Sequence, residues 1–114
     1  MPRNNEESRL QQACVKWFDM QYPELYRNLW AVPNGGNRNV ITGATMKREG
    51  VRPGVSDLMF FYGNQLHCIE MKKPGGKLSA EQINFLEQMD KCGAEVYLCD
   101  SFETFQTIIR EAVG

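Results

Sequence analysis

Three residues have side chains and a spacing that could do chemistry together: Asp57, Glu70 and Lys72. Residues 65–72 have the composition of a strand, and two residues that are two positions apart on a strand point to the same face. A turn at residues 63–64 joins this strand to another that covers residues 56–62, and the short connection predicts an antiparallel hairpin. Asp57 should therefore lie beside Glu70 and Lys72 at one end of the hairpin.

Such a cluster favours metal-assisted hydrolysis of a phosphate ester. Two carboxylates at one point repel each other unless a cation lies between them. Mg²⁺ and Mn²⁺ prefer oxygen ligands, and Mg²⁺ commonly takes one or two carboxylates with waters and a substrate phosphate. The backbone carbonyl of Met71 could add an oxygen ligand, and Lys72 could orient or deprotonate a water or stabilise charge on the phosphate. The alternative is a solvated ion pair at the strand ends.

The elements that must position these residues follow from the apolar periodicity. It predicts helices over residues 6–20 and 79–91 and a last helix that starts after Asp100 or Ser101, with strands over 29–32, 56–62, 65–72 and 94–99. Residues 42–48 could form a further short helix. The order α-β-β-β-α-β-α predicts an α/β fold, a mixed sheet flanked by helices, and the length of 114 residues predicts one domain over residues 1–114.

The composition argues against several other kinds of site. The four cysteines show no C-x-x-C pair, and His67 is the only histidine, which disfavours zinc sites and histidine-based catalysis. Cys14, Cys68 and Cys99 lie in apolar patterns and should be buried, reduced thiols. The sequence has neither a P-loop nor a G-x-G-x-x-G motif, so no nucleotide cofactor is expected. Without a long apolar stretch or a signal region, we expect no membrane span and a cytoplasmic location.

The charge is unevenly distributed along the chain. The formal net charge of −1 for the whole chain argues against a nucleic-acid partner. Residues 38–77, however, hold seven Lys or Arg and three Asp or Glu, so this segment has a net charge of +4. The remainder of the chain has a net charge of −5. A basic patch around the proposed site is typical of proteins that bind the phosphate backbone, and a solvated basic loop is the alternative. Besides Lys72, the candidate nucleic-acid-binding residues are Arg38, Lys47, Arg48, Arg52, Lys73 and Lys77.

At the level of motifs, Asp57…Glu70-Met71-Lys72 resembles the D…E-x-K signature of the PD-(D/E)xK nuclease superfamily. More closely, the chain resembles the virus-type replication-repair nuclease (VRR-NUC) family. The resemblance rests on five stretches in the family's order: E-S-R-L-Q at 7–11, V-P-N-G-G at 32–36, G-V-R-P-G-V-S-D-L at 50–58, I-E-M-K at 69–72 and S-A-E-Q at 79–82. Ser56 stands where the superfamily's name has proline, a position that shapes the backbone and supplies no ligand.

This resemblance implies a restriction-endonuclease-like core and a role for each matching residue. Asp57 and Glu70 would be metal ligands, Lys72 the catalytic lysine, Glu7 an additional acidic member of the site, and Gln82 an active-site glutamine. Glu7 could instead serve only the electrostatics of its helix start. Gln82 could be the capping-box partner of Ser79, and both roles are compatible. His67 alternates out of phase with Glu70, which indicates a structural or surface position.

The function implied by the resemblance is a Mg²⁺- or Mn²⁺-dependent DNA endonuclease. Small members of the family tend to be homodimers that cut branched DNA such as Holliday junctions in DNA repair. The chain is most similar to stand-alone, phage-type members, which would act in the host cytoplasm. The alternatives are a nuclease of other specificity (a nickase, an exonuclease or a restriction-type enzyme) and a non-catalytic nucleic-acid-binding module. Aromatic residues around Trp17, Tyr22, Tyr26 and Trp30 are candidates for a dimer surface.

Overall fold

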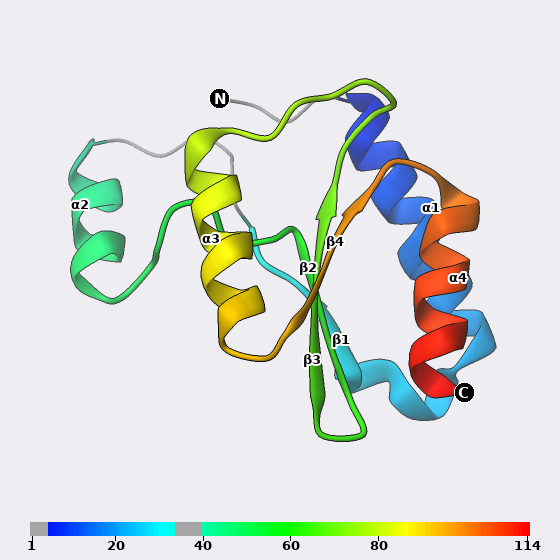
Figure 1. Cartoon of the computed structure of the whole chain (residues 1–114). Coiled ribbons are helices and arrows are strands. Elements are labelled where there is room, and N and C mark those ends of the chain that lie inside the picture. Colours follow the sequence, from blue (N-terminus) through cyan, green and yellow to red (C-terminus); the bar gives the residue numbers. More distant parts are fainter. Residues whose placement is uncertain (1–4, 34–39) are drawn as a thin grey trace.

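The computed structural model describes residues 5–33 and 40–114 (Figure 1). Arg38, one of the candidate DNA contacts, lies outside these residues. None of the helices formed by the described residues is long and apolar enough to cross a membrane. The elements in chain order are α1 (Asn5–Gln21), a 3₁₀ helix η1 (Pro23–Asn28), β1 (Leu29–Ala31), α2 (Val40–Arg48), β2 (Leu58–Tyr62), β3 (Gln65–Met71), α3 (Ala80–Lys91), β4 (Glu95–Cys99) and α4 (Phe102–Val113).

The strands form one mixed sheet in the order β1-β2-β3-β4, as the α/β prediction requires. β2 pairs with β1 and with β3 in the antiparallel sense, whereas β3 and β4 run parallel and are joined through α3. In the hairpin Leu58 is opposite Ile69. The same register, continued by one residue, sets Asp57 opposite Glu70.

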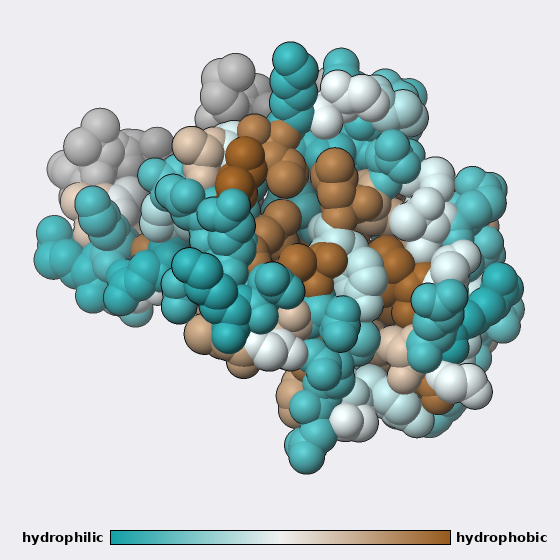
Figure 2. All heavy atoms as spheres, in the orientation of Figure 1, coloured by the Kyte–Doolittle hydropathy of each residue, from teal (hydrophilic) through white to brown (hydrophobic). Residues whose placement is uncertain are grey.

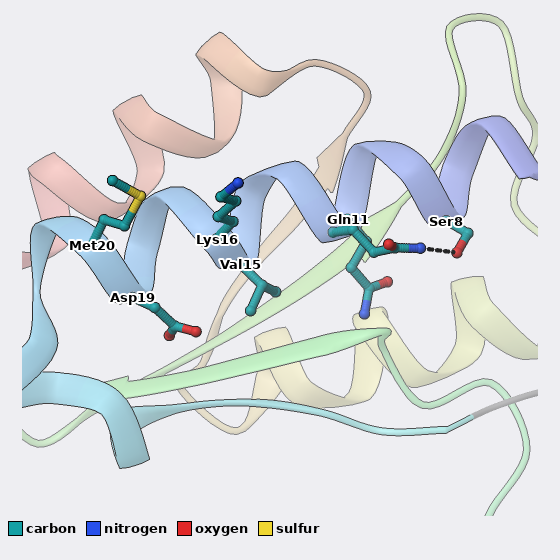
Figure 3. A pocket seen from close by; sticks show the side chains of 7 residues that line it. Ser8, Gln11, Val15, Lys16, Asp19 and Met20 are labelled. Atoms are coloured by element: carbon teal, nitrogen blue, oxygen red, sulfur yellow. Dashed lines mark hydrogen bonds between the residues drawn. The ribbon is translucent and has the colours of Figure 1, made fainter.

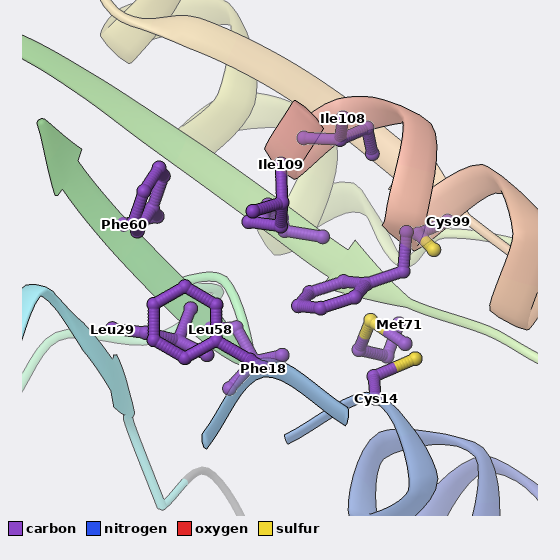
Figure 4. Close-up of a cluster of buried hydrophobic side chains, with 11 residues drawn as sticks. Cys14, Phe18, Leu29, Leu58, Phe60, Met71, Cys99, Ile108 and Ile109 are labelled. Atoms are coloured by element: carbon purple, nitrogen blue, oxygen red, sulfur yellow. The ribbon is translucent and has the colours of Figure 1, made fainter. Parts of the chain in front are cut away.

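Helices cover both faces of the sheet. α1 and α4 lie on one face and α3 on the other, with α2 beyond α3 (Figure 1). The core fills the space between the sheet and the α1–α4 layer (Figure 4). Because side chains alternate along a strand, Ile69 and Met71 enter this core and Glu70, between them, belongs to the opposite face. The buried core residues are Cys14, Phe18, Leu29, Leu58, Phe60, Ile69, Met71, Cys99, Phe105, Ile108 and Ile109.

Three of the four thiols and the histidine are buried. Cys14, Cys68 and Cys99 are buried and free, as predicted, while Cys92 is exposed at the end of α3. Burial raises the pKa of Cys14 to about 12 and that of Cys68 to about 11, so both thiols stay protonated at neutral pH. His67 is buried between the rings of Phe60 and Tyr97, and its Nδ1 lies 3.0 Å from the Tyr97 hydroxyl.

Two of the four aromatic residues considered for a dimer surface are partly buried and pack against the core. Trp17 makes edge-on contacts with Tyr22, Phe102 and Phe105, and the guanidinium of Arg110 lies over its ring. Tyr26 and Trp30 remain exposed. Trp17 and Tyr22 are thus less available than Tyr26 and Trp30, because α4 supplies two rings and a cation against Trp17, and the dimer surface stays a prediction.

Candidate active site

The two carboxylates lie at neighbouring positions at one end of the β2–β3 hairpin. Asp57 is 7% exposed and Glu70 is 1% exposed, so both are largely removed from solvent. One oxygen of Asp57, Oδ2, accepts a hydrogen bond of 2.9 Å from the backbone N–H of Met71. The carbonyl of Asp57 accepts another from Val32, beyond the end of β1. Asp57 is therefore fixed by the strands on both sides, at the place that the alternation pattern predicted.

Lys72 follows β3 directly and extends its pairing with β4. Its backbone N–H donates to the carbonyl of Cys99 at 2.9 Å. Its side chain is half-buried, and its stem passes Gly76, where an added Cβ would lie 3.4 Å from the Cβ of Lys72. The turn at residues 74–76 thus supports the aliphatic part of the lysine, whose position in the strand alternation puts it on the Glu70 face.

Glu7 reaches the same edge of the sheet from the first turn of α1. Its Oε2 accepts a long hydrogen bond, 3.4 Å, from the backbone N–H of Lys73, across 66 residues of sequence. Figure 1 shows the start of α1 beside the segment that follows β3. Glu7 therefore lies next to the residue that follows Lys72. Asn4, its possible capping partner, lies outside the described residues.

Gln82 holds the start of α3 and contacts Glu70 at the same time. Ser79 and Gln82 form a complete capping box: the Ser79 N–H donates to Gln82 Oε1 at 2.8 Å, and Ser79 Oγ accepts from the Gln82 N–H at 3.2 Å. Gln82 Nε2 donates to Glu70 Oε1 at 3.0 Å. Because a backbone N–H can only donate, it must face Oε1, which leaves Nε2 for the carboxylate. The capping-box role of Gln82 is therefore confirmed, and its contact with Glu70 is compatible with the predicted active-site role, which stays a prediction.

The oxygen donors at this edge fit a hard divalent cation. Asp57 and Glu70 provide two adjacent carboxylates, and the Met71 carbonyl lies between Glu70 and Lys72 in the chain. Among the described residues, no three His, Cys, Asp or Glu side chains form a ready-made metal cluster. Two carboxylates and a carbonyl are oxygen ligands of the kind that hard divalent cations such as Mg²⁺ bind together with waters and phosphate oxygens.

The candidate DNA contacts divide into two groups. Lys73 and Lys77 are exposed and follow Lys72 closely in the chain. Lys47 and Arg52 line a pocket of about 530 Å³ that extends to Gln82. Arg48 is exposed at the end of α2, and its guanidinium donates to the Thr45 hydroxyl at 3.2 Å. Figure 2 shows that the surface over α2 and the outer side of α3 is mainly hydrophilic.

One contact that supports the site was not predicted. Gly54 has a φ of +79°, and a Cβ at this position would overlap the backbone carbonyl of Glu81 in the first turn of α3. The loop that precedes Asp57 is thus packed directly on the helix that carries Gln82. The glycines and the proline in residues 50–54 were the available signal, because they indicate a special backbone conformation.

A different pocket, of about 450 Å³, runs along α1 (Figure 3). Its described lining includes Ser8, Gln11, Val15, Asp19 and Met20, and none of these lining residues is a candidate site residue. Gln12 donates to the Ser8 hydroxyl at 3.0 Å within this region. The candidate site residues therefore lie outside this pocket.

Comparisons with known proteins agree with the fold. The model of the VRR-NUC domain matches residues 5–103. A solved structure described as a "VRR_NUC domain protein" shares 19% sequence identity and superposes with a TM-score of 0.78, over 94% of this chain and 87% of that chain. No curated protein matches the sequence.

The family match gives the class: the chain is a nuclease of the PD-(D/E)xK type, a class of hydrolases that typically use divalent metal ions. More particularly, it belongs to the VRR-NUC family. The α/β prediction and the predicted family are confirmed.

Proposed function

We propose that the protein is a Mg²⁺- or Mn²⁺-dependent DNA endonuclease that hydrolyses phosphodiester bonds in branched DNA and acts as a homodimer. The observation that carries the proposal is the pair of buried carboxylates, Asp57 and Glu70, at one end of the hairpin with Lys72 directly after them. Burial of two adjacent acids is costly without a cation. A divalent metal that binds there would offset this cost.

Asp57, Glu70 and the Met71 carbonyl would hold the metal. When bound, such an ion polarises a phosphoryl oxygen and makes a bound water a better nucleophile. Glu70 would be oriented for this task by Gln82, whose amide is itself fixed by the capping box. Asp57 would be held by the Met71 N–H on the neighbouring strand.

Lys72 would act on the reacting phosphate. An ammonium group on the Glu70 face can orient the attacking water and stabilise the negative charge that develops on the phosphate oxygens. Glu7 would add negative charge at the same edge and anchor the backbone after Lys72. The basic residues of α2, of the loop before β2 and of the turn after β3 would bind the flanking phosphates.

Selectivity for branched DNA and the homodimer are supported by the resemblance of the sequence to small members of the family. A two-fold dimer presents two identical sites, which suits two symmetric cuts across a four-way junction. Tyr26 and Trp30 are exposed and could contribute to the contact between the copies.

The experiment is a cleavage screen. The pure protein is incubated with labelled four-way junctions, flaps, single strands and linear duplexes, with Mg²⁺, Mn²⁺ or EDTA. We expect metal-dependent cutting of the junction in preference to the linear duplex. No cleavage of any DNA with either metal would refute the nuclease proposal. Mapping the products separates an endonuclease from a nickase, an exonuclease or a restriction-type enzyme.

The screen also separates the enzyme from a non-catalytic DNA-binding module. Such a module would bind the same DNA without turnover at any metal concentration. A module that has lost catalysis is expected to lack at least one of the candidate catalytic residues. Here Asp57, Glu70 and Lys72 are all present.

A further inference from the structure

The pocket beside the candidate active site has the lining of a ligand site. It lies between α2, the loop at residues 51–55 and the first turn of α3, and its volume of about 530 Å³ is within the roughly 300–1,000 Å³ typical of small-molecule sites. Much of its wall is apolar, and three charged residues join it. The apolar side chains are Pro33, Met46, Val51, Pro53 and Val55, and the charged ones are Lys47, Arg52 and Glu81.

Two features fix the wall formed by α3 and the loop. Gly54 packs against the carbonyl of Glu81, where no side chain would fit. The capping box fixes Ser79 and Gln82, which also line the pocket. This side of the pocket is therefore built before any ligand arrives, which reduces the entropic cost of binding.

The pocket adjoins the carboxylates. Gln82 lines it and donates to Glu70, so one side chain belongs to both. Val55 lines it as well and lies two residues before Asp57, which limits the distance between their Cα atoms to about 7 Å. A group bound in the pocket would lie beside a phosphate held at Asp57 and Glu70.

We propose that this pocket receives the base of an unpaired nucleotide next to the scissile phosphate. This inference rests on the proposed nuclease function and specifies how its site selects DNA. The flat face of a base would lie against the apolar wall, and Glu81 can accept hydrogen bonds from amino groups on its edge. Lys47 and Arg52 supply the positive charge that the adjoining phosphates require.

The pocket provides a physical reason for a preference for branched DNA. A base within a duplex must be unstacked and unpaired before it can enter a pocket, and this cost is lowest for a base that is already unpaired. Bases at a branch point or in a flap satisfy this condition more readily than bases in a continuous duplex. Selectivity would then arise from the accessibility of one nucleotide.

The test uses 2-aminopurine, a fluorescent base whose emission is quenched by stacking and rises when the base leaves the stack. The probe is placed in turn at each nucleotide around a flap junction, and emission is recorded with the full chain in EDTA, which prevents metal-dependent cleavage. Anisotropy of a distal label measures binding in the same samples. We expect a severalfold rise in emission at one position, adjacent to the bond that is cut when Mn²⁺ is added.

A matched pair of variants connects the signal to this pocket. Gly43 lines the pocket from α2, and a Cβ added there meets nothing within 4 Å, so Gly43→Leu adds a side chain at the wall and also favours the helix. Ala44→Leu makes a comparable addition at the next residue of α2, which is exposed and does not line the pocket. Gly43→Leu should lose most of the emission rise and bind the flap about tenfold more weakly, whereas Ala44→Leu should behave as the wild type.

The outcomes separate this inference from the proposed function. Cleavage and binding without an emission rise at any position, or a rise that Gly43→Leu leaves unchanged, would overturn the pocket assignment and leave the nuclease proposal intact. A rise that Gly43→Leu abolishes, in a protein that cuts no DNA, would support the pocket and refute the nuclease. Absence of both binding and cleavage would refute both.

Discussion

At the scale of single residues, the candidate site depends on how each carboxylate is held. Asp57 accepts from the Met71 N–H, and Glu70 accepts from the Gln82 amide. Both carboxylates could be located from the sequence, because strand alternation and a short hairpin determine which side chains are neighbours. The Glu7–Lys73 contact could not be derived in this way. It joins residues 66 apart, so only the resemblance to a family suggested Glu7.

Two substitutions at Asp57 separate its chemical from its structural role. Asp57→Asn keeps an oxygen that can accept from Met71 but removes the charge, whereas Asp57→Ala removes both. We expect both variants to lose cleavage. Asp57→Ala should be less stable than Asp57→Asn by about 1–3 kcal/mol, because a buried N–H loses its partner. Urea unfolding and junction cleavage measure the two effects. Cleavage by Asp57→Asn at the wild-type rate would contradict its role as a metal ligand.

A substitution at Gln82 can keep its place in the capping box and remove the hydrogen bond that it donates to Glu70. Glutamate is as suitable as glutamine in a capping box, so Gln82→Glu should retain the helix start. It would place a carboxylate against Glu70 where an N–H now donates. We expect the helix start to be kept, the melting temperature to fall because Glu70 gains a like-charged neighbour, and cleavage to be reduced at least about tenfold. Gln82→Leu, which loses both contacts, is the control. Full activity of Gln82→Glu would show that the Gln82–Glu70 contact has no role.

At the level of secondary structure, the sequence predicted the helices and strands better than the segments that connect them. The hairpin, the capped helix α3 and the last helix follow from periodicity and turn residues, and Ser101 caps α4 as one of two residues foreseen. The 3₁₀ helix at Pro23–Asn28 was missed, because it is a single short segment with a kink at Leu25 and has no periodic apolar face. The packing of the loop before β2 on α3 was missed too, because such a contact depends on tertiary structure.

That packing predicts unequal effects at two glycines with similar backbone angles. Gly54 and Gly50 both have positive φ values, of +79° and +105°. An added Cβ has no neighbour within 4 Å at Gly50, but at Gly54 it overlaps the Glu81 carbonyl. Gly50→Ala should cost about 1 kcal/mol from backbone strain alone, and Gly54→Ala at least about 2 kcal/mol more. Denaturant unfolding measures both. Equal losses of stability would contradict the tight packing of the loop on α3.

At the scale of the whole molecule, the charge distribution decides how DNA would be bound. The whole chain has a net charge of −1, although the segment between residues 38 and 77 has a net charge of +4. Lys47 and Arg52 line the pocket that extends to Gln82, and Lys73 and Lys77 follow the candidate lysine. The sequence located this basic segment, but the pocket could not be predicted, because its walls come from four separate parts of the chain.

Binding should therefore depend on salt through a few identified residues. Arg52→Ala and Lys73→Ala should each weaken DNA binding and reduce the slope of log K against log salt by about 1, as expected for the loss of one phosphate contact. Lys91→Ala, at the end of α3 and outside the basic segment, should leave the slope unchanged. Anisotropy titrations at several salt concentrations give the slopes. An equal effect of all three substitutions would mean that the basic segment has no special role.

The assignment of the active site to Asp57, Glu70 and Lys72 is tested by single-turnover cleavage of a four-way junction in Mn²⁺. The proteins compared are the wild type, Lys72→Met and Lys91→Met. Methionine keeps most of the aliphatic stem beside Gly76 and removes only the charge. We expect Lys72→Met to bind the junction but to cut it at least about a hundredfold more slowly, in the range that loss of one transition-state contact produces. Lys91→Met should cut as the wild type does. Cleavage by Lys72→Met at the wild-type rate would contradict the assignment of the active site to Asp57, Glu70 and Lys72.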